Sequence, residues 1–141
     1  MKQALEKNHE RVKKTRSIAI VVCLSALCVG TNYAMLPLSN VKLMDTVVFT
    51  TSLAFGFATG AAVAALSWLV YGTLNPLGFS APILATVILS EMVYPYAGLM
   101  VRRNRSLREL NSSSITRSVV LGTTGFLCTL AYDLITNAVS G

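Results

Sequence analysis

The segment "LMDTVVFTTSLAFGFATGAAVAALSWLVY", residues 43–71, is one apolar run of about 29 residues. About 20 apolar residues already cross the hydrocarbon core of a bilayer, so this run is long for one span and short for two. Gly56 and Gly60 stand four residues apart within it, in "GFATG". Glycines at this spacing permit both a sharp reversal and a close approach of two helices. The run therefore forms either one long helix or a hairpin of two short ones.

The basic residues of the flanking sequence choose between these alternatives. Six of the twelve Lys and Arg residues fall within residues 2–16, five more lie at residues 102–117, and Lys42 is the remaining one. Short cytoplasmic loops of membrane proteins are enriched in Lys and Arg. With the N-terminus in the cytoplasm, only a hairpin returns the second basic block to that side. We therefore predict that the run folds back near Gly56–Gly60 into helices of about 15 residues each.

The apolar stretches outside the hairpin complete the count of spans. They cover residues 17–36, 79–101 and 118–139. Charged residues make up only 13% of the chain, about half the share in a soluble globular domain. The sequence predicts an all-α, polytopic membrane helix bundle with about five spans and a cytoplasmic N-terminus. A basic cytoplasmic segment (residues 1–16) precedes a single transmembrane helical domain (residues 17–141), and the basic blocks indicate contact with lipid rather than with nucleic acid.

Polar residues gather at the predicted outer ends of these helices, as expected for a cup that collects a ligand from outside. The loop "NPLGFSAP" (residues 75–82) joins the third and fourth spans there, and its prolines and glycine suit a rigid rim. The aromatic residues of the set also fit an alternative role as interfacial anchors. The candidate substrate-binding residues are Asn32, Tyr33, Trp68, Tyr71, Asn75, Glu91, Asp133 and Asn137.

Two of these candidates are acids inside apolar spans. Glu91 lies in the middle of residues 79–101, and Asp133 lies about two turns from the outer end of the last span. An acid at the bilayer centre costs roughly 2.5–3.5 kcal/mol on insertion scales, so pairing or function is the expected explanation. Both are predicted to be protonated, hydrogen-bonded to Tyr, Asn or Thr, or in contact with a polar or cationic ligand. Asp45 has the simpler explanation of pairing with Lys42, three residues away.

Motifs of catalysis and metal binding are absent from the sequence. It contains no Gly-rich phosphate loop, no His-Glu-x-x-His motif and no Ser/His or Cys/His pair within the spans. We therefore expect no enzyme activity, no ATP hydrolysis by the chain itself, and no metal or other cofactor. A distant alternative is an intramembrane hydrolase using Glu91 and Asp133 as an acid pair.

The segment "NYAMLPLSNVKLMDTVVFTTSLAFGFATGAAVAALSWLVYGTLNPLGFSAPILATVILSEMVYPYAGLMVRR", residues 32–103, resembles the substrate-binding (S) component of energy-coupling factor (ECF) transporters, particularly the archaeal-type members. The resemblance rests on the order of a short turn, a glycine-punctuated hairpin, the "LNPLG" loop, an acidic fourth span and "DLITN" in the last. It implies a helical membrane fold that binds a vitamin, a vitamin-like compound or a metal ion near the outer face.

The same resemblance implies partners. The family docks through small residues of its first helix onto a coupling membrane subunit driven by paired cytosolic ATPases, and Ala26, Gly30 and Ala34 match that spacing here. The family has six helices, whereas five are counted here. The resemblance therefore implies either a truncated product or a sixth helix supplied elsewhere.

The main functional hypothesis is a substrate-capture subunit of an ECF-type vitamin or micronutrient uptake transporter, multi-pass in the plasma membrane. The runner-up is a non-transporting membrane adaptor or assembly protein, in which the acids only hold helices together.

Overall fold

A computed structural model describes residues 2–37, 43–74, 78–104 and 115–140. Within these ranges the chain is helical and has no strand, which confirms the predicted all-α fold. Three helical segments are long and apolar enough to cross a membrane, and two shorter ones are apolar. The protein is therefore a helical membrane bundle. Its helices are α1 (Lys2–Ala34), α2 (Met44–Phe55), α3 (Phe57–Thr73), α4 (Ala81–Glu91), α5 (Val93–Arg103) and α7 (Ile115–Ser140).

The apolar run folds back as predicted. Helix α2 ends at Phe55, and α3 begins at Phe57 after a single residue, Gly56, whose φ is +101°. L-amino acids with a side chain rarely adopt this φ, so glycine is required at the reversal. The two arms have 12 and 17 residues, close to the predicted 15.

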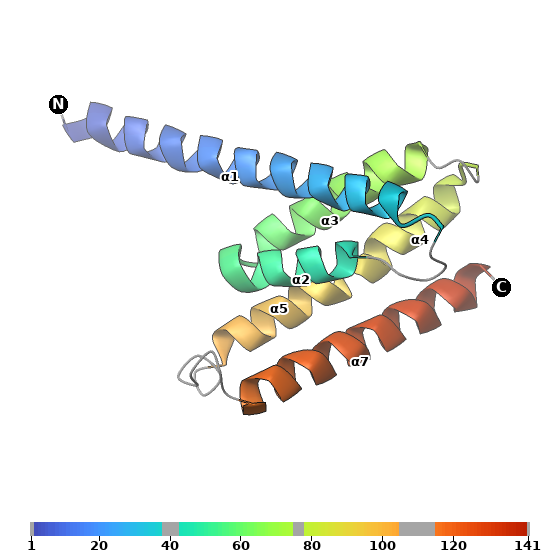
Figure 1. Cartoon of the computed structure of the whole chain (residues 1–141). Coiled ribbons are helices and arrows are strands. Elements are labelled where there is room, and N and C mark those ends of the chain that lie inside the picture. The colour runs from blue at the N-terminus through green and yellow to red at the C-terminus, as the bar shows by residue number, and fades with distance from the viewer. Residues whose placement is uncertain (1, 38–42, 75–77, 105–114, 141) are drawn as a thin grey trace.

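The hairpin turn lies beside the arginine-rich end of α5. A Cβ atom placed on Gly56 would stand 2.9 Å from Nη1 of Arg102. Figure 1 shows five passes of the chain, and the α2–α3 turn lies at the same end of the bundle as the N-terminal half of α1, the end of α5 and the start of α7. These three segments carry the described basic residues. The basic segments therefore lie at one end of the bundle, as the positive-inside rule requires. The assignment of this end to the cytoplasm stays a prediction.

The fourth pass is two helices rather than the single predicted one. Helix α4 ends at Glu91 and α5 begins at Val93. Pro95 has no N–H to donate to the carbonyl of Glu91, four residues earlier, and so the ladder of hydrogen bonds is interrupted. The N–H of Met92 instead bonds to the carbonyl of Leu89 at 3.2 Å, a tighter turn than the α-helix.

Helices α2, α3 and α5 meet most closely around Ser52. A Cβ on Gly60 would lie 2.7 Å from the Cβ of Ser52, and a Cβ on Gly98 would lie 2.7 Å from the carbonyl oxygen of Phe49. The hydroxyl of Ser52 donates a hydrogen bond of 2.6 Å to the carbonyl of Pro95. We call Ser52, Gly60 and Gly98 the small-residue junction. It is the kind of contact that glycines make possible between membrane helices.

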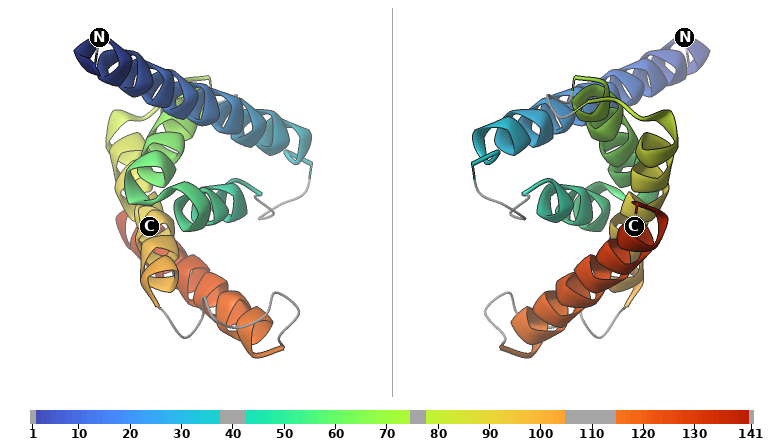
Figure 2. Two further views of the ribbon diagram at one scale, coloured as in Figure 1. Left: turned by 90° about the vertical axis from the view of Figure 1, so that its left-hand side faces the viewer. Right: turned by 90° about the vertical axis from the view of Figure 1, so that its right-hand side faces the viewer.

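Helices α1 and α7 flank the bundle on opposite sides. Helix α1 packs on α3 and α2, and α7 packs on α4 and α5, so that the ribbon opens between α1 and α7 with α2 in the opening (Figure 2). The basic residues 2–16 belong to the same continuous helix as the first span. At 1.5 Å per residue α1 is about 50 Å long, well beyond the ~30 Å hydrocarbon core.

Candidate functional site

Glu91 lies at the centre of the bundle, at the end of α4. Its side chain is fully buried, and its Oε2 accepts a hydrogen bond of 3.1 Å from Nε1 of Trp68 on α3. A buried carboxyl group is tolerated where hydrogen bonds replace water. Glu91 was predicted to contact Tyr, Asn or Thr, or a ligand. The structure shows Trp68, another candidate residue, as a hydrogen-bond partner.

Two aromatic candidates, Tyr71 and Tyr33, continue from this pair toward the end of α1. The ring of Tyr71 lies edge-on to Trp68 at 5.8 Å and to Tyr33 at 5.3 Å between centroids. The hydroxyl of Tyr33 donates a hydrogen bond of 2.8 Å to the carbonyl of Leu74, at the end of α3. Edge-to-face pairs at these distances are favourable. The structure thus joins Tyr33, Tyr71, Trp68 and Glu91 into one chain of contacts across α1, α3 and α4.

The remaining candidates are placed differently. Asn32 is buried, and its Nδ2 lies 3.6 Å from the sulfur of Met44 at the start of α2. Asp133 is half-buried on α7, and Asn137 on the same helix is exposed. Asn75 and Lys42, the predicted partner of Asp45, lie outside the described residues.

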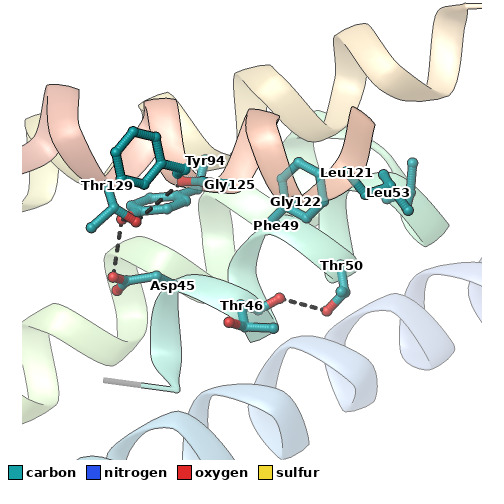
Figure 3. Close-up of a pocket in the computed structure, with 11 residues that line it drawn as sticks. Asp45, Thr46, Phe49, Thr50, Leu53, Tyr94, Leu121, Gly122, Gly125 and Thr129 are labelled. Atoms are coloured by element: carbon teal, nitrogen blue, oxygen red, sulfur yellow. Dashed lines mark hydrogen bonds between the residues drawn. The ribbon is translucent and has the colours of Figure 1, made fainter. Parts of the chain in front are cut away.

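A cavity of about 520 Å³ opens between α2, α5 and α7. We call it the α2–α7 pocket. Its volume falls within the ~300–1,000 Å³ range of small-molecule sites. In Figure 3, Asp45, Tyr94 and Thr129 converge from three helices at one end of the pocket, and Thr46 and Thr50 lie further along α2. The lining residues are Asp45, Thr46, Phe49, Thr50, Leu53, Tyr94, Leu121, Gly122, Gly125, Phe126 and Thr129.

The hydroxyl of Tyr94 connects the three helices at this polar end. It lies 3.0 Å from Oδ2 of Asp45 and 3.2 Å from Oγ1 of Thr129. A phenol has one proton to donate and two lone pairs to accept with. Thr129 donates its own proton to the carbonyl of Gly125 at 3.1 Å, so the single proton of Tyr94 is directed at Asp45 and Thr129, both as acceptors. The network therefore ties α2, α5 and α7 together at this end of the pocket.

Large apolar side chains line the pocket further along α2, beside Thr50. Phe49 and Leu53 follow Asp45 at successive turns of α2, and Leu121 faces them from α7 (Figure 3). The two glycines on α7, Gly122 and Gly125, have no atom within 4 Å of the position of a Cβ. The absence of side chains at these glycines leaves room on the α7 wall.

Of the predicted site residues, the seven that the structure describes all lie outside the lining of the α2–α7 pocket. The sequence interpretation assigned Asp45 to an ion pair and did not include Tyr94 or Thr129 among the candidate site residues. Tyr94 lies 49 residues from Asp45 and 35 from Thr129, so no local pattern links them. A signal did exist in the spacing of Asp45, Phe49 and Leu53, which puts an acid and two large apolar residues on one face of α2.

The predicted docking residues share an outward face of α1. Ala26, Gly30 and Ala34 are all exposed, and a Cβ on Gly30 would meet no atom within 4 Å. Their face is open, and docking of a partner helix through it stays a prediction.

Among the described residues, no group of three or more His, Cys, Asp or Glu side chains could hold a metal ion. No protein-family model, curated protein or solved structure matches this chain.

Proposed function

We propose that the protein is a membrane-embedded subunit that captures a small molecule in the α2–α7 pocket, as a multi-pass protein of the plasma membrane. The observation that supports this proposal is the pocket itself. It has the size of a ligand site, a polar cluster built by three helices at one end, and a lining of mainly apolar side chains elsewhere. Binding sites in helical bundles commonly form between facing helices in this way.

The resemblance to ECF S components extends the proposal to partners. In that reading the chain takes up a vitamin-like compound and docks on a coupling transmembrane subunit powered by paired ATPases. The exposed small-residue face of α1 supports such docking, because helices approach closely where side chains are small. This face and the α2–α7 pocket belong to different helices, so capture and docking are separable by mutation.

Ligand capture is tested with purified protein in lipid nanodiscs. Thermal unfolding is followed in the presence of a panel of water-soluble vitamins and membrane-soluble amphiphiles, and a captured compound raises the midpoint. The variant Gly125→Phe fills the pocket from a position with free space around it. Its matched control is Gly30→Phe, at an equally open position on α1. We expect a shift in the wild type and in Gly30→Phe, and none in Gly125→Phe.

Docking gives the reverse pattern. When the chain is co-expressed with an ECF coupling subunit and its ATPases, Gly30→Phe is expected to lose association and Gly125→Phe to retain it. If one variant loses both ligand capture and docking, or if neither variant loses either property, the proposed division of roles between α7 and α1 is wrong.

The structure also offers support for the adaptor alternative. Glu91 bonds to Trp68, and Asp45 bonds to Tyr94, so two acids inside the bundle contribute to holding helices together. The adaptor reading predicts that no compound shifts the unfolding of well-folded protein, and that Gly125→Phe behaves like the wild type in every assay. That outcome would remove the capture proposal.

A further inference from the structure

We infer that the ligand of the α2–α7 pocket is an uncharged lipophile of the bilayer rather than a charged, water-soluble compound. The inference rests on the proposed capture function and specifies the substrate class of that site. Three features of the pocket support it: its depth in the bundle, the side on which it opens, and the engagement of its polar groups with the protein.

The pocket lies along the middle part of α7. Its lining residues on this helix run from Leu121 to Thr129. At 1.5 Å per residue, Leu121 is about 9 Å from Ile115 and Thr129 is about 16 Å from Ser140 along the helix axis. The whole helix is about 39 Å long, so a ~30 Å hydrocarbon core covers all but its ends. The pocket therefore lies at the depth of the acyl chains.

The pocket opens on the side of the bundle. Phe126 lines the pocket from α7 and is 67% exposed, and the lining residues Thr46 and Thr50 on α2 are exposed as well. These residues mark the rim of the pocket, since they belong to its lining and also face the surroundings. They lie where the ribbon opens between α1 and α7 (Figure 2). At this depth the surroundings of the rim are lipid.

The hydroxyl groups of Thr50, Thr129 and Tyr94 in the lining are engaged with the protein. Thr50 donates to the carbonyl four residues earlier at 2.7 Å, and Thr129 does the same at 3.1 Å. Threonine side chains in helices often bond back to their own helix in this way. The proton of Tyr94 is directed at Asp45 and Thr129. The three hydroxyls therefore have no further proton to donate, and a ligand with few polar groups fits them.

The acid of the lining does not select a charged ligand. Oδ2 of Asp45 accepts from Tyr94, and its Oδ1 is buried, so the carboxylate belongs to the contact between helices. Among the described lining residues there is no Lys, Arg or His to pair with an anion. A charge at this depth is costly unless it is paired. The lining thus favours a ligand without charge.

The apolar lining suits a compact lipophile. Phe49 and Leu53 on α2 face Leu121 and Phe126 on α7 across a space of about 520 Å³. Two sources can supply the chemistry that fits there: a free lipophile dissolved in the bilayer, or the acyl chain of a bilayer lipid. Both are uncharged where they meet the lining, and two arms of one experiment distinguish them.

The experiment is photolabelling of the full-length protein in phosphatidylcholine nanodiscs. The probe is adamantane diazirine, an uncharged lipophile that attaches to the residues it contacts when it is illuminated. Labelled residues are identified by mass spectrometry, and the saturable labelling is the part that excess adamantane removes. Two other competitors keep the adamantyl body and add a permanent charge: adamantyl trimethylammonium and adamantane sulfonate.

Saturable labelling is expected on α2 between Asp45 and Leu53, and on the facing part of α7. The variant Gly125→Phe, which fills the pocket, should lose this labelling. Its control Gly30→Phe, at an open position on α1, should retain it. At equal concentration in the bilayer, the two charged analogues should compete at least about tenfold less well than adamantane, because the lining does not pair with their charge.

The second arm replaces the free probe with phosphatidylcholine that carries a diazirine in the middle of one acyl chain. Labelling of the α2 wall that disappears in Gly125→Phe supports the inference with the bilayer lipid as the source. Saturable labelling by adamantane diazirine alone supports it with a free lipophile as the source.

Two results would overturn the inference. One is competition by either charged analogue as strong as that by adamantane. The other is the lack of any labelling, from either probe, that Gly125→Phe removes. In both cases the capture proposal stands if a compound of the larger panel raises the unfolding midpoint of the wild type and not of Gly125→Phe. If no compound does so, capture fails as well.

Discussion

Helix α2 has two sides that differ in how they meet the rest of the bundle. On one side the small-residue junction brings α3 and α5 so close that Gly60 and Gly98 have no room for a Cβ. On the other side α2 faces α7 across a cavity of about 520 Å³. A helix of 12 residues thus takes part both in the tightest contact described in the bundle and in its ligand-sized space.

The two sides use the same residue type to opposite effect. Glycines at the junction allow backbones to approach, as small residues do between membrane helices. Gly122 and Gly125 on α7 are not at a close contact between helices, because nothing lies within 4 Å of where their Cβ atoms would be. What a glycine does here depends on what faces it, and the difference can be measured by substituting each one.

The largest expected effect is at the junction. In Gly98→Leu the new side chain meets the carbonyl of Phe49 and the Cβ of Ser52, both at distances below 3.0 Å from the Cβ alone. Neither neighbour can rotate away, since one is backbone and the other is a bound serine. We expect a loss of about 3 kcal/mol in the free energy of unfolding, measured by denaturant titration in mixed micelles. A stability equal to the wild type would show that α5 does not approach α2 as described.

The next effect is at the buried acid. Trp68→Phe preserves an aromatic ring but removes the N–H that Glu91 accepts. A buried acceptor that loses a partner costs about 2 kcal/mol, so unfolding should become easier by that amount in the same titration. The control is the double variant Trp68→Phe with Glu91→Leu, which removes both partners and should recover most of the loss. Additive losses in the double variant would contradict the pairing.

A smaller effect is expected on the pocket side. Tyr94→Phe removes the hydroxyl that links α2, α5 and α7 at the polar end. Asp45 is half-buried beside the cavity, so water can replace the lost partner and the cost is about 1 kcal/mol. Tyr96→Phe, at an exposed position on the same helix, is the matched control and should leave the free energy of unfolding unchanged.

The smallest effect is a gain. In Gly122→Ala the added methyl group enters free space, and alanine is the better helix former by about 1 kcal/mol. Unfolding should therefore become harder by up to that amount. The same substitution at Gly98 should be destabilising, because its Cβ has no room. If both alanine variants moved stability in the same direction, the contrast between the two sides of α2 would be wrong.

Much of the fold could be predicted because its signals are local or concern the whole chain. The reversal at Gly56 requires a conformation that glycine adopts readily. The two separate basic blocks indicate that an even number of spans lies between them. The break before α5 was also readable, since Pro95 cannot donate to the carbonyl of Glu91. Its consequence was missed because the apolar run of residues 79–101 continues unbroken across it.

The candidate site was predicted only in part, for a physical reason. Trp68, Tyr71 and Tyr33 lie at the same depth in their helices, and depth is readable from the sequence once the spans are known. Which face of α7 meets α2 is not, because polar and apolar residues are distributed around α7 with little difference between its sides. The link from Asp45 through Tyr94 to Thr129 depends on that rotation.

The unbroken course of α1 has a consequence for any partner of this protein. Arg16 and Ala34 are 18 residues apart, which is five full turns at about 3.6 residues per turn. A coupling helix seated along Ala26, Gly30 and Ala34 would therefore find Arg16 above it, in line with the contact. Since the helix has no break between its apolar and its basic half, any twist imposed on the apolar half changes the orientation of the charged tip.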